Sequence, residues 1–309
     1  MRRFVIFFTM HATTVSAPTI QSQLKGVDTG VATRWQERLT RYRQTIDDLV
    51  VDIANPYQIS TDERAALASR IKHANMAIYR YQSIDTVGPD TLTAFAAQLG
   101  LGIPDQNLCA DTDGLSKIQV EKISTHQRYI PYTNKPLNWH TDGYYHTPDR
   151  LIRTMLLHCV RPALQGGTLE AMDHEIIYGL LHEQDPRLAE ALCHWDAMTI
   201  PENRPQGGPH RVQCSGPVFF WDAGALRMRY TARKQNVIWK HDNQTREGVA
   251  ALEEILAGSG DLIVRRRLRP GEGLVCANVP HRREAFNDSQ QTGQTRLVYR
   301  GRYTSALQI

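Results

Sequence analysis

His140 and Asp142 are separated by one residue in the segment 138–142, which reads as a short β-strand. On a strand, residues i and i+2 point to the same side, so this imidazole and this carboxylate are able to converge on one metal ion. Two histidines and one carboxylate form a facial set of ligands that leaves open positions on the metal. That arrangement is typical of non-haem Fe(II) oxygenases, and it requires a third ligand from a distant part of the chain.

A histidine and an aspartate at this spacing are weak evidence alone, because the chain has 12 histidines. A second pair, His194 and Asp196, has the same spacing. It follows a predicted helix and precedes a segment rich in Pro and Gly, so we interpret it as ordinary polar residues near a strand start. His140, in contrast, has more aromatic and polar neighbours, in the segment Trp139-His140-Thr141-Asp142-Gly143-Tyr144-Tyr145.

His281 is the candidate third ligand, because it follows an apolar strand predicted over 272–278. The next predicted strand, 295–303, places three arginines on one face by its period of two, namely Arg296, Arg300 and Arg302. Arginines on a buried face need anions, and the guanidinium fork binds both oxygens of a carboxylate. A face that is simply solvated is the alternative that the sequence leaves open.

Short strands dominate the elements that must position these residues. We expect them over 117–121, 138–142, 152–160, 167–172, 194–199, 217–221, 226–230, 261–266, 272–278 and 295–303. Helices are predicted over 173–192 and 243–257, and further helices and one strand before residue 100. Many short strands separated by turns favour a sandwich or barrel, so we predict a mainly β fold with flanking α-helices.

One domain is expected over 31–309, with a helical N-terminal portion, after an irregular segment over 1–30. The Pro- and Gly-rich stretch 201–216 reads as a long loop that could serve as a lid. The start of the chain, MRRFVIFFTM, has the charge and the apolar run of a secretory signal, but the run is short.

Composition excludes several classes of protein. The 309 residues carry 36 Lys and Arg against 32 Asp and Glu, a net charge of +4. That mild bias suits anionic small molecules and gives no sign of a nucleic-acid tail. We see no apolar stretch long enough for a membrane span. Five cysteines without a CxxC pair indicate a reducing, cytoplasmic location, and nothing excludes a homo-oligomer.

The ordered motifs resemble those of the taurine dioxygenase-like Fe(II)/2-oxoglutarate dioxygenases. The frame around His140 and Asp142 resembles the first iron motif of that family. The segment 281–286, preceded by Asn278, resembles the second. Between them, Gly166-Gly167-Thr168 resembles the segment whose threonine binds 2-oxoglutarate, and Arg296 occupies the position of the arginine that binds this co-substrate. The resemblance covers roughly residues 70 to 303.

The resemblance implies a double-stranded β-helix, or jelly-roll, with Fe(II) held by His140, Asp142 and His281. It implies that 2-oxoglutarate binds Thr168 and Arg296, with Arg300 as the alternative to Arg296. The reaction would consume O2, release succinate and CO2, and oxidise a C–H bond of a small substrate. Halogenases of this type lack the carboxylate ligand, so Asp142 favours hydroxylation.

The primary substrate is less well defined by the sequence. We expect an anionic molecule, such as a carboxylate or sulfonate, and candidate contacts at Asn138, Tyr144, Tyr145 and Arg300. Two other classes of function stay open: a non-redox jelly-roll protein that binds a small anion or metal, and a zinc hydrolase with the same ligands. Only an oxygenase would form succinate in a reaction dependent on Fe(II) and O2.

Overall fold

A computed structural model describes residues 29–82, 87–106, 114–120, 130–204, 210–233, 235–288 and 295–309. The chain divides into two compact units, residues 1–37 and 38–309. Most of the first unit, 1–28, lies outside the described residues, and with it nearly all of the segment predicted to be irregular. The fold described below is that of the second unit.

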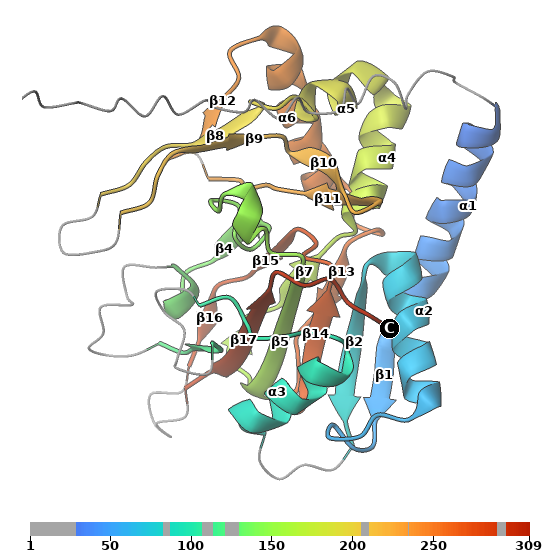
Figure 1. Ribbon diagram of the computed structural model, residues 1–309, viewed down its shortest axis with the longest axis vertical. Coiled ribbons are helices and arrows are strands. Elements are labelled where there is room, and N and C mark those ends of the chain that lie inside the picture. Colours follow the sequence, from blue (N-terminus) through green and yellow to red (C-terminus); the bar gives the residue numbers. More distant parts are fainter. Residues whose placement is uncertain are drawn as a thin grey trace, which may run out of the picture. The chain divides into compact units, whose positions relative to one another are not determined.

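The larger sheet has six strands within the described residues, and most of them run side by side in Figure 1. Their order across the sheet is β1 (Val50–Ile53), β2 (Met76–Tyr81), β14 (Glu272–Cys276), β5 (Thr154–Arg161), β17 (Leu297–Tyr303) and β3 (Ser116–Ile118). Neighbours pair antiparallel except β1 and β2, which are parallel. This sheet therefore joins segments from both ends of the chain.

A smaller sheet carries the candidate metal ligands. Its described strands follow the order β13 (Val264–Arg266), β7 (Leu169–Ala171), β15 (His281–Arg283) and β4 (Leu137–His140). Shorter pairings involve β12 (Ile238–Trp239) with β8 (Met198–Ile200) and β9 (Cys214–Gly216), β10 (Phe219–Asp222) with β11 (Ala225–Met228), and β16 (Phe286–Asn287) with β6 (Gln165–Gly166).

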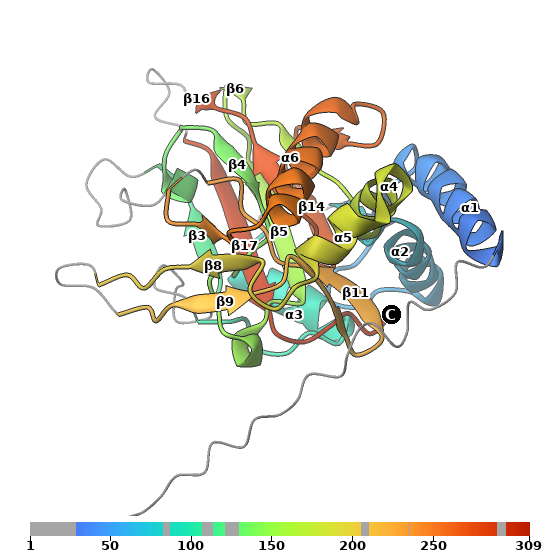
Figure 2. The same ribbon diagram turned by 90° about the horizontal axis from the view of Figure 1, so that it is seen from above.

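Helices surround these sheets, and side-chain caps fix where several of them begin. Their bounds are α1 (Thr29–Ile46), α2 (Thr61–Ala74), α3 (Pro89–Gln98), α4 (His174–Gln184), α5 (Pro186–Leu192) and α6 (Asn243–Gly258). Ser60 and Glu63 form a capping box at the start of α2. The helices α4, α5 and α6 pack together, as Figure 2 shows. No helix in the described part of the chain has the length and apolar character needed to cross a membrane.

The main apolar core lies between the larger sheet and the helices α2 and α3. Leu67 of α2 and Phe95 of α3 are fully buried there, against Tyr79 of β2 and Val275 of β14. Tyr79 also contacts Phe95 through its ring, with centroids 4.7 Å apart. Because burial of such side chains is the dominant favourable term in folding, this core fixes the sheet on which β5, β14 and β17 are held in register.

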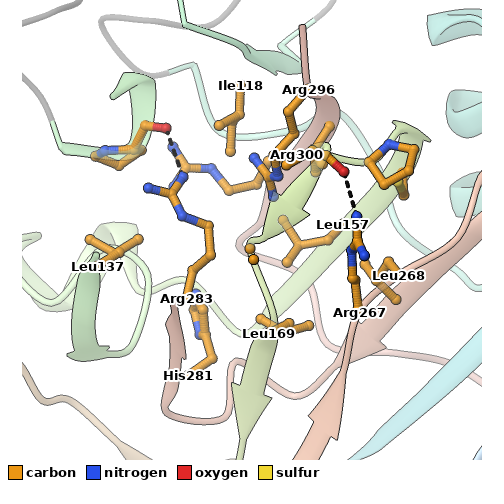
Figure 3. A pocket seen from close by; sticks show the side chains of 17 residues that line it. Ile118, Leu137, Leu157, Leu169, Arg267, Leu268, His281, Arg283, Arg296 and Arg300 are labelled. Atoms are coloured by element: carbon orange, nitrogen blue, oxygen red, sulfur yellow. Dashed lines mark hydrogen bonds between the residues drawn. The ribbon is translucent and has the colours of Figure 1, made fainter. Parts of the chain in front are cut away.

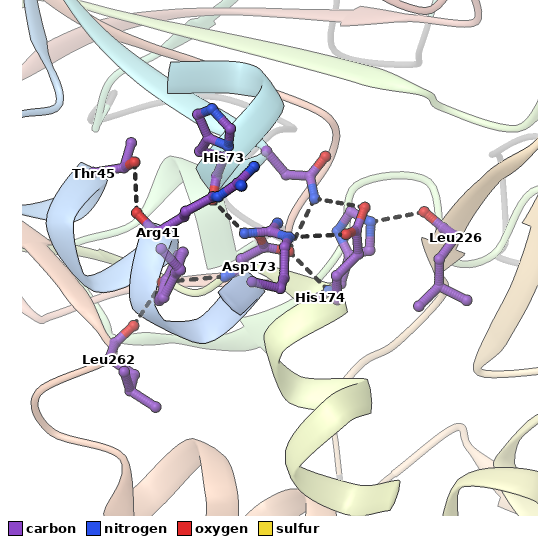
Figure 4. A network of polar contacts seen from close by, with 11 residues as sticks. Arg41, Thr45, His73, Asp173, His174, Leu226 and Leu262 are labelled. Atoms are coloured by element: carbon purple, nitrogen blue, oxygen red, sulfur yellow. Dashed lines mark hydrogen bonds and ion pairs between the residues drawn. The ribbon is translucent and has the colours of Figure 1, made fainter. Parts of the chain in front are cut away.

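A polar network ties the smaller sheet to the helices (Figure 4). Asp173 follows β7, caps the start of α4 through the backbone N–H of Glu175 (2.8 Å), and forms an ion pair with Arg38 of α1. The amide of Asn75, at the end of α2, donates to the same Asp173 carboxylate (3.0 Å). His174, the residue after Asp173, contacts the carbonyl of Leu226 in β11 (2.8 Å). The end of β7 is thereby fixed, and β7 is the strand that pairs with β15.

The predicted strand and helix types agree with the structure in most of these places, and some predictions are wrong in detail. The strand expected over 194–199 begins only at Met198, the first residue of β8. The helix expected over 173–192 is two helices, because Pro186 cannot donate to the α4 ladder and Asp185 caps α5 instead. The expected loop 201–216 is in part a hairpin: β8 pairs with β9, and Asn203 bridges Arg211 beyond them. Residues 205–209 of that stretch lie outside the described residues.

Candidate active site

His140, Asp142 and His281 come together at one edge of the smaller sheet. His140 ends β4 and His281 begins β15, and these two residues are direct partners in the antiparallel pairing. Their ring centroids are 4.3 Å apart. Asp142 lies in the turn after β4, not on the strand as the sequence suggests. Ligand atoms of all three buried residues still lie within 4.8 Å of one another, which allows one metal ion to contact all three.

Both histidines are held in the orientation that a metal ligand needs. The Nδ1–H of His140 donates to the carbonyl of Asn138 (2.9 Å), and that of His281 donates to Val279 (3.0 Å). Each Nε2 therefore keeps a free lone pair. Burial lowers the pKa of both imidazoles, and His281 helps to lower that of His140 to about 3. At neutral pH both rings are in the neutral form that binds metals.

Asp142 is a charged carboxylate with one oxygen left for a ligand. Burial alone would raise its pKa, but the positive charge of Arg300 leads the effects that hold this pKa below its usual range. Arg300 donates to Oδ1 at 3.1 Å, whereas Oδ2 is buried without a hydrogen-bond partner. A buried carboxylate oxygen is costly unless something binds it. This oxygen and the two free Nε2 atoms fit a divalent iron ion.

Asn278 connects the two loops that carry the ligands. Its Oδ1 accepts from the backbone N–H of Asp142 (2.8 Å), and its Nδ2 donates to the carbonyls of Asp142 (2.9 Å) and Ile152 (2.8 Å). Its φ of 53° lies in the left-handed region, which asparagine tolerates better than most residues. The sequence places Asn278 in a motif but gives no sign of this bonding, which joins residues 136 positions apart.

A small cavity of about 50 Å³ opens beside His281, and Figure 3 shows the side chains that line it. Four arginines line it. Arg267 is bound to the carbonyls of Ala163 and Leu164. Arg283 is already bound to the backbone carbonyls of residues 131, 133 and 135, and Arg300 is paired with Asp142. Arg296 has a buried Nη1 without a hydrogen-bond partner. A guanidinium with an unused donor suits a carboxylate, and the binding of 2-oxoglutarate by Arg296 stays a prediction.

The Gly166-Gly167-Thr168 segment borders this cavity. Gly166 has a φ of 71°, and a Cβ there would lie 2.3 Å from the carbonyl oxygen of Ala285, so only glycine fits this close approach. Both glycines line the cavity. Thr168 is not among its lining residues in the described part of the chain, and its carbonyl accepts from the N–H of Glu284 (3.0 Å). The binding of 2-oxoglutarate by Thr168 stays a prediction.

A larger cavity of about 390 Å³ includes His140 and Asp142 in its wall. The candidate substrate contacts from the sequence all line it: Asn138, Tyr144, Tyr145 and Arg300. Arg300 lines both cavities. The structure therefore brings these residues together around one space, and their contact with substrate stays a prediction.

Arg229 fixes the hairpin that forms one wall of the larger cavity, and the sequence analysis did not single it out. Its buried guanidinium donates to four backbone carbonyls: those of Tyr144 (2.7 Å), Met198 (2.9 Å), Cys214 (2.9 Å) and Gly216 (3.2 Å). It thereby binds β8 and β9 to the segment after Asp142. No signal in the sequence identifies a cation whose partners are all backbone atoms.

The second pair, His194 and Asp196, forms no comparable site. The two residues bond to each other, and Lys240 lies 4.0 Å from the Asp196 carboxylate. Both side chains are 30–40% exposed. Within the residues that the structure describes, His140, Asp142 and His281 are the group of three that could hold a metal ion. The structure thus gives the first pair, His140 and Asp142, a third candidate ligand.

The chain matches known proteins along most of its length. The family model described as taurine catabolism dioxygenase TauD, TfdA family matches residues 36–301. A uridine-5'-phosphate dioxygenase from Streptomyces sp is 29% identical over 226 residues, which are 70% of this chain and 79% of that relative.

Solved structures share the fold at low sequence identity. A taurine dioxygenase from Burkholderia xenovorans superposes with a TM-score of 0.54 at 15% identity, covering 81% of this chain and 84% of that one. The non-haem iron oxygenase OrfP, in complex with Fe, succinate and (3S)-hydroxy-L-Arg, superposes with a TM-score of 0.57 at 16% identity, covering 89% and 91%. The chain thus belongs to the TauD/TfdA family and is a non-haem iron dioxygenase that uses 2-oxoglutarate as co-substrate.

Proposed function

We propose that this enzyme hydroxylates a small phosphorylated substrate of the nucleoside monophosphate class, with iron on His140, Asp142 and His281 and 2-oxoglutarate on Arg296. One observation carries this proposal: the buried ligands line two cavities. His281 lines the smaller cavity with Arg296, and His140 and Asp142 line the larger one. Co-substrate and substrate would thus reach the same metal from separate cavities.

The bound iron and 2-oxoglutarate supply the activation of O2, with succinate and CO2 as the products of the co-substrate. The residues of this chain orient and shield the site. Arg300 keeps Asp142 charged, Asn278 holds its backbone, and Arg296 anchors the distal carboxylate. Apolar side chains such as Leu157 and Leu169 line the smaller cavity and would exclude water from the co-substrate.

The class of substrate is supported by the larger cavity and by the Streptomyces relative, whose name states uridine-5'-phosphate as its substrate. Among the described lining residues are five arginines and one carboxylate, Asp142. A phosphate binds guanidinium groups by the same forked hydrogen bonds as the carboxylate or sulfonate expected from the sequence.

Two further predictions stand as part of this proposal. We infer that the larger and smaller sheets are the two halves of a double-stranded β-helix, which the largely antiparallel pairing in both supports. A reducing, cytoplasmic location is supported by the free thiols of the four described cysteines: Cys159, Cys193, Cys214 and Cys276.

An anaerobic titration with Fe(II) and 2-oxoglutarate tests the iron site. The intact protein is expected to develop the visible charge-transfer band of a chelated complex. His140→Ala should lose the band because it removes one of three ligands, whereas the matched control His194→Ala should keep it. Loss of the band in both variants, or in neither, would contradict the assignment of the metal site.

Arg296→Ala is expected to raise the KM for 2-oxoglutarate by about one to two orders of magnitude, because a charge-assisted hydrogen bond contributes about 1.5–3 kcal/mol. Fe(II) binding should be unchanged, since Arg296 contacts none of the three ligands. Succinate formation at varied 2-oxoglutarate measures the effect. Arg267→Ala is the matched control: Arg267 lines the same cavity, but its guanidinium is bound to the carbonyls of Ala163 and Leu164. An equal rise in that variant would refute the specific role of Arg296.

A further inference from the structure

The larger cavity has more positive charge than its own residues neutralise. Five arginines line its described wall, from four separate segments of the chain: Arg150, Arg211, Arg233, Arg300 and Arg302. A cation that faces a partly buried space is costly unless an anion compensates it. The ion pairs of these five arginines therefore show where the protein leaves charge for a ligand.

Three of the five arginines form ion pairs with carboxylates of the protein itself. Arg300 pairs with Asp142 (3.1 Å), and Arg302 pairs with Asp105 (2.5 Å). Arg150 reaches the other oxygen of the same Asp105 carboxylate (2.5 Å). Two carboxylates are thus shared among these three guanidiniums, and each of the three has an ionic partner within the protein.

Arg211 and Arg233 have no carboxylate partner in the part of the chain that the structure describes. One Nη atom of Arg211 donates to the carbonyl of Pro201 (3.2 Å), and its Nε is buried without an acceptor. Its guanidinium lies over the ring of Tyr145, 5.5 Å from the centroid. Arg233 forms no hydrogen bond or ion pair with the described residues, and its exposed side chain lines the cavity.

The two arginines line the same cavity, on segments that other contacts hold in place. Arg211 belongs to the hairpin that Arg229 fixes, and Arg233 lies two residues after Thr231, which bridges His140. The pair is thus built into the wall that also holds a metal ligand.

We propose that Arg211 and Arg233 form the phosphate subsite of the larger cavity and bind the phosphate monoester of the substrate. Two uncompensated guanidiniums match the near-dianion that a phosphate monoester carries at neutral pH, whereas a carboxylate would neutralise only one. This inference rests on the proposed phosphorylated substrate and adds to it the residues that select the phosphate.

Binding of methyl phosphate, uridine-5'-phosphate and uridine to the anaerobic enzyme loaded with Fe(II) and 2-oxoglutarate tests this subsite by calorimetry. Arg211→Gln and Arg233→Gln are each expected to weaken both phosphorylated ligands by on the order of 10- to 100-fold and to leave uridine unchanged. The charge-transfer band should persist in both variants, which shows that the fold and the iron site are intact. Arg204→Gln is the matched control, since Arg204 is exposed, pairs with Glu202 on the same hairpin and does not line the cavity.

The outcomes distinguish a failure of the subsite proposal from a failure of the proposed substrate. Weaker methyl phosphate binding in Arg211→Gln and Arg233→Gln alone supports the subsite, even where uridine-5'-phosphate is not oxidised and the nucleotide proposal fails. Turnover of uridine-5'-phosphate with an unchanged KM in both variants overturns the subsite and keeps the substrate. An equal loss in Arg204→Gln, or an equal loss for uridine, also overturns it, because the effect would then be general charge or misfolding.

Discussion

Replacing Asp142 with asparagine is expected to lower the affinity for Fe(II) by on the order of a thousandfold and to abolish succinate formation at ordinary iron concentrations. The change keeps the shape of the side chain but removes the charge that Arg300 and the metal both need. Removing one partner of a buried ion pair costs about 3–5 kcal/mol, because the other charge is left uncompensated. In Asp142→Asn the charge left uncompensated would be that of Arg300, whose side chain is only 9% exposed.

An anaerobic competition between the protein and a chelator for Fe(II) measures this loss, and succinate formation measures its effect on the reaction. Asp196→Asn is the matched control, because Asp196 has the same His-x-Asp spacing but no third candidate ligand among the residues that the structure describes. That variant should bind iron as the intact protein does. Retention of tight iron binding by Asp142→Asn would show that the two histidines suffice and that Asp142 serves only to neutralise Arg300.

The sequence predicts the ligand group well because its signals are local. His140 and Asp142 are two residues apart, and His281 follows a strongly apolar strand, so periodicity alone places each near a strand end. The antiparallel pairing that sets His281 opposite His140 is not visible in the sequence. It enters through the resemblance to a family, which supplies the long-range partner that spacing cannot.

The roles of the arginines that line the cavities cannot be predicted from the local sequence alone. The period of two predicted over 295–303 puts Arg296, Arg300 and Arg302 on one face, and all three line a cavity. The strand β17 itself begins only at Leu297, and its pairing shifts register between Leu297 and Val298. The period of two does not separate the roles of the arginines, because those depend on carboxylates from elsewhere: Asp142 for Arg300 and Asp105 for Arg302. The role of Arg211 is harder still to predict from the sequence, because the Pro- and Gly-rich stretch that contains it gives no sign of the hairpin that holds it.

Asn278 is the position where we expect the largest change in stability. Asn278→Ala removes three hydrogen bonds from buried backbone groups of Asp142 and Ile152 and forces alanine into a left-handed conformation. Each buried group left unpaired costs about 1–3 kcal/mol, and left-handed backbone costs about 1–2 kcal/mol for such a residue. The free energy of unfolding is therefore expected to fall by about 4 kcal/mol or more, measured by urea denaturation of the metal-free protein.

Asn278→Gly separates the two causes, because glycine adopts a φ of 53° without strain. It should be more stable than Asn278→Ala by about 1 kcal/mol and still lose the amide bonds. The turn of Asp142 is then no longer tied to the strand of His281, so Fe(II) affinity should fall about 10- to 100-fold, as for other residues that orient metal ligands. Asn138→Gly offers a comparison at a residue that lines the larger cavity and whose side chain does not bond to a ligand-bearing loop. If Asn278→Gly bound iron as tightly as the intact protein, Asn278 would be a stabilising residue only, and the geometry of the ligands would be set by the pairing of β4 with β15.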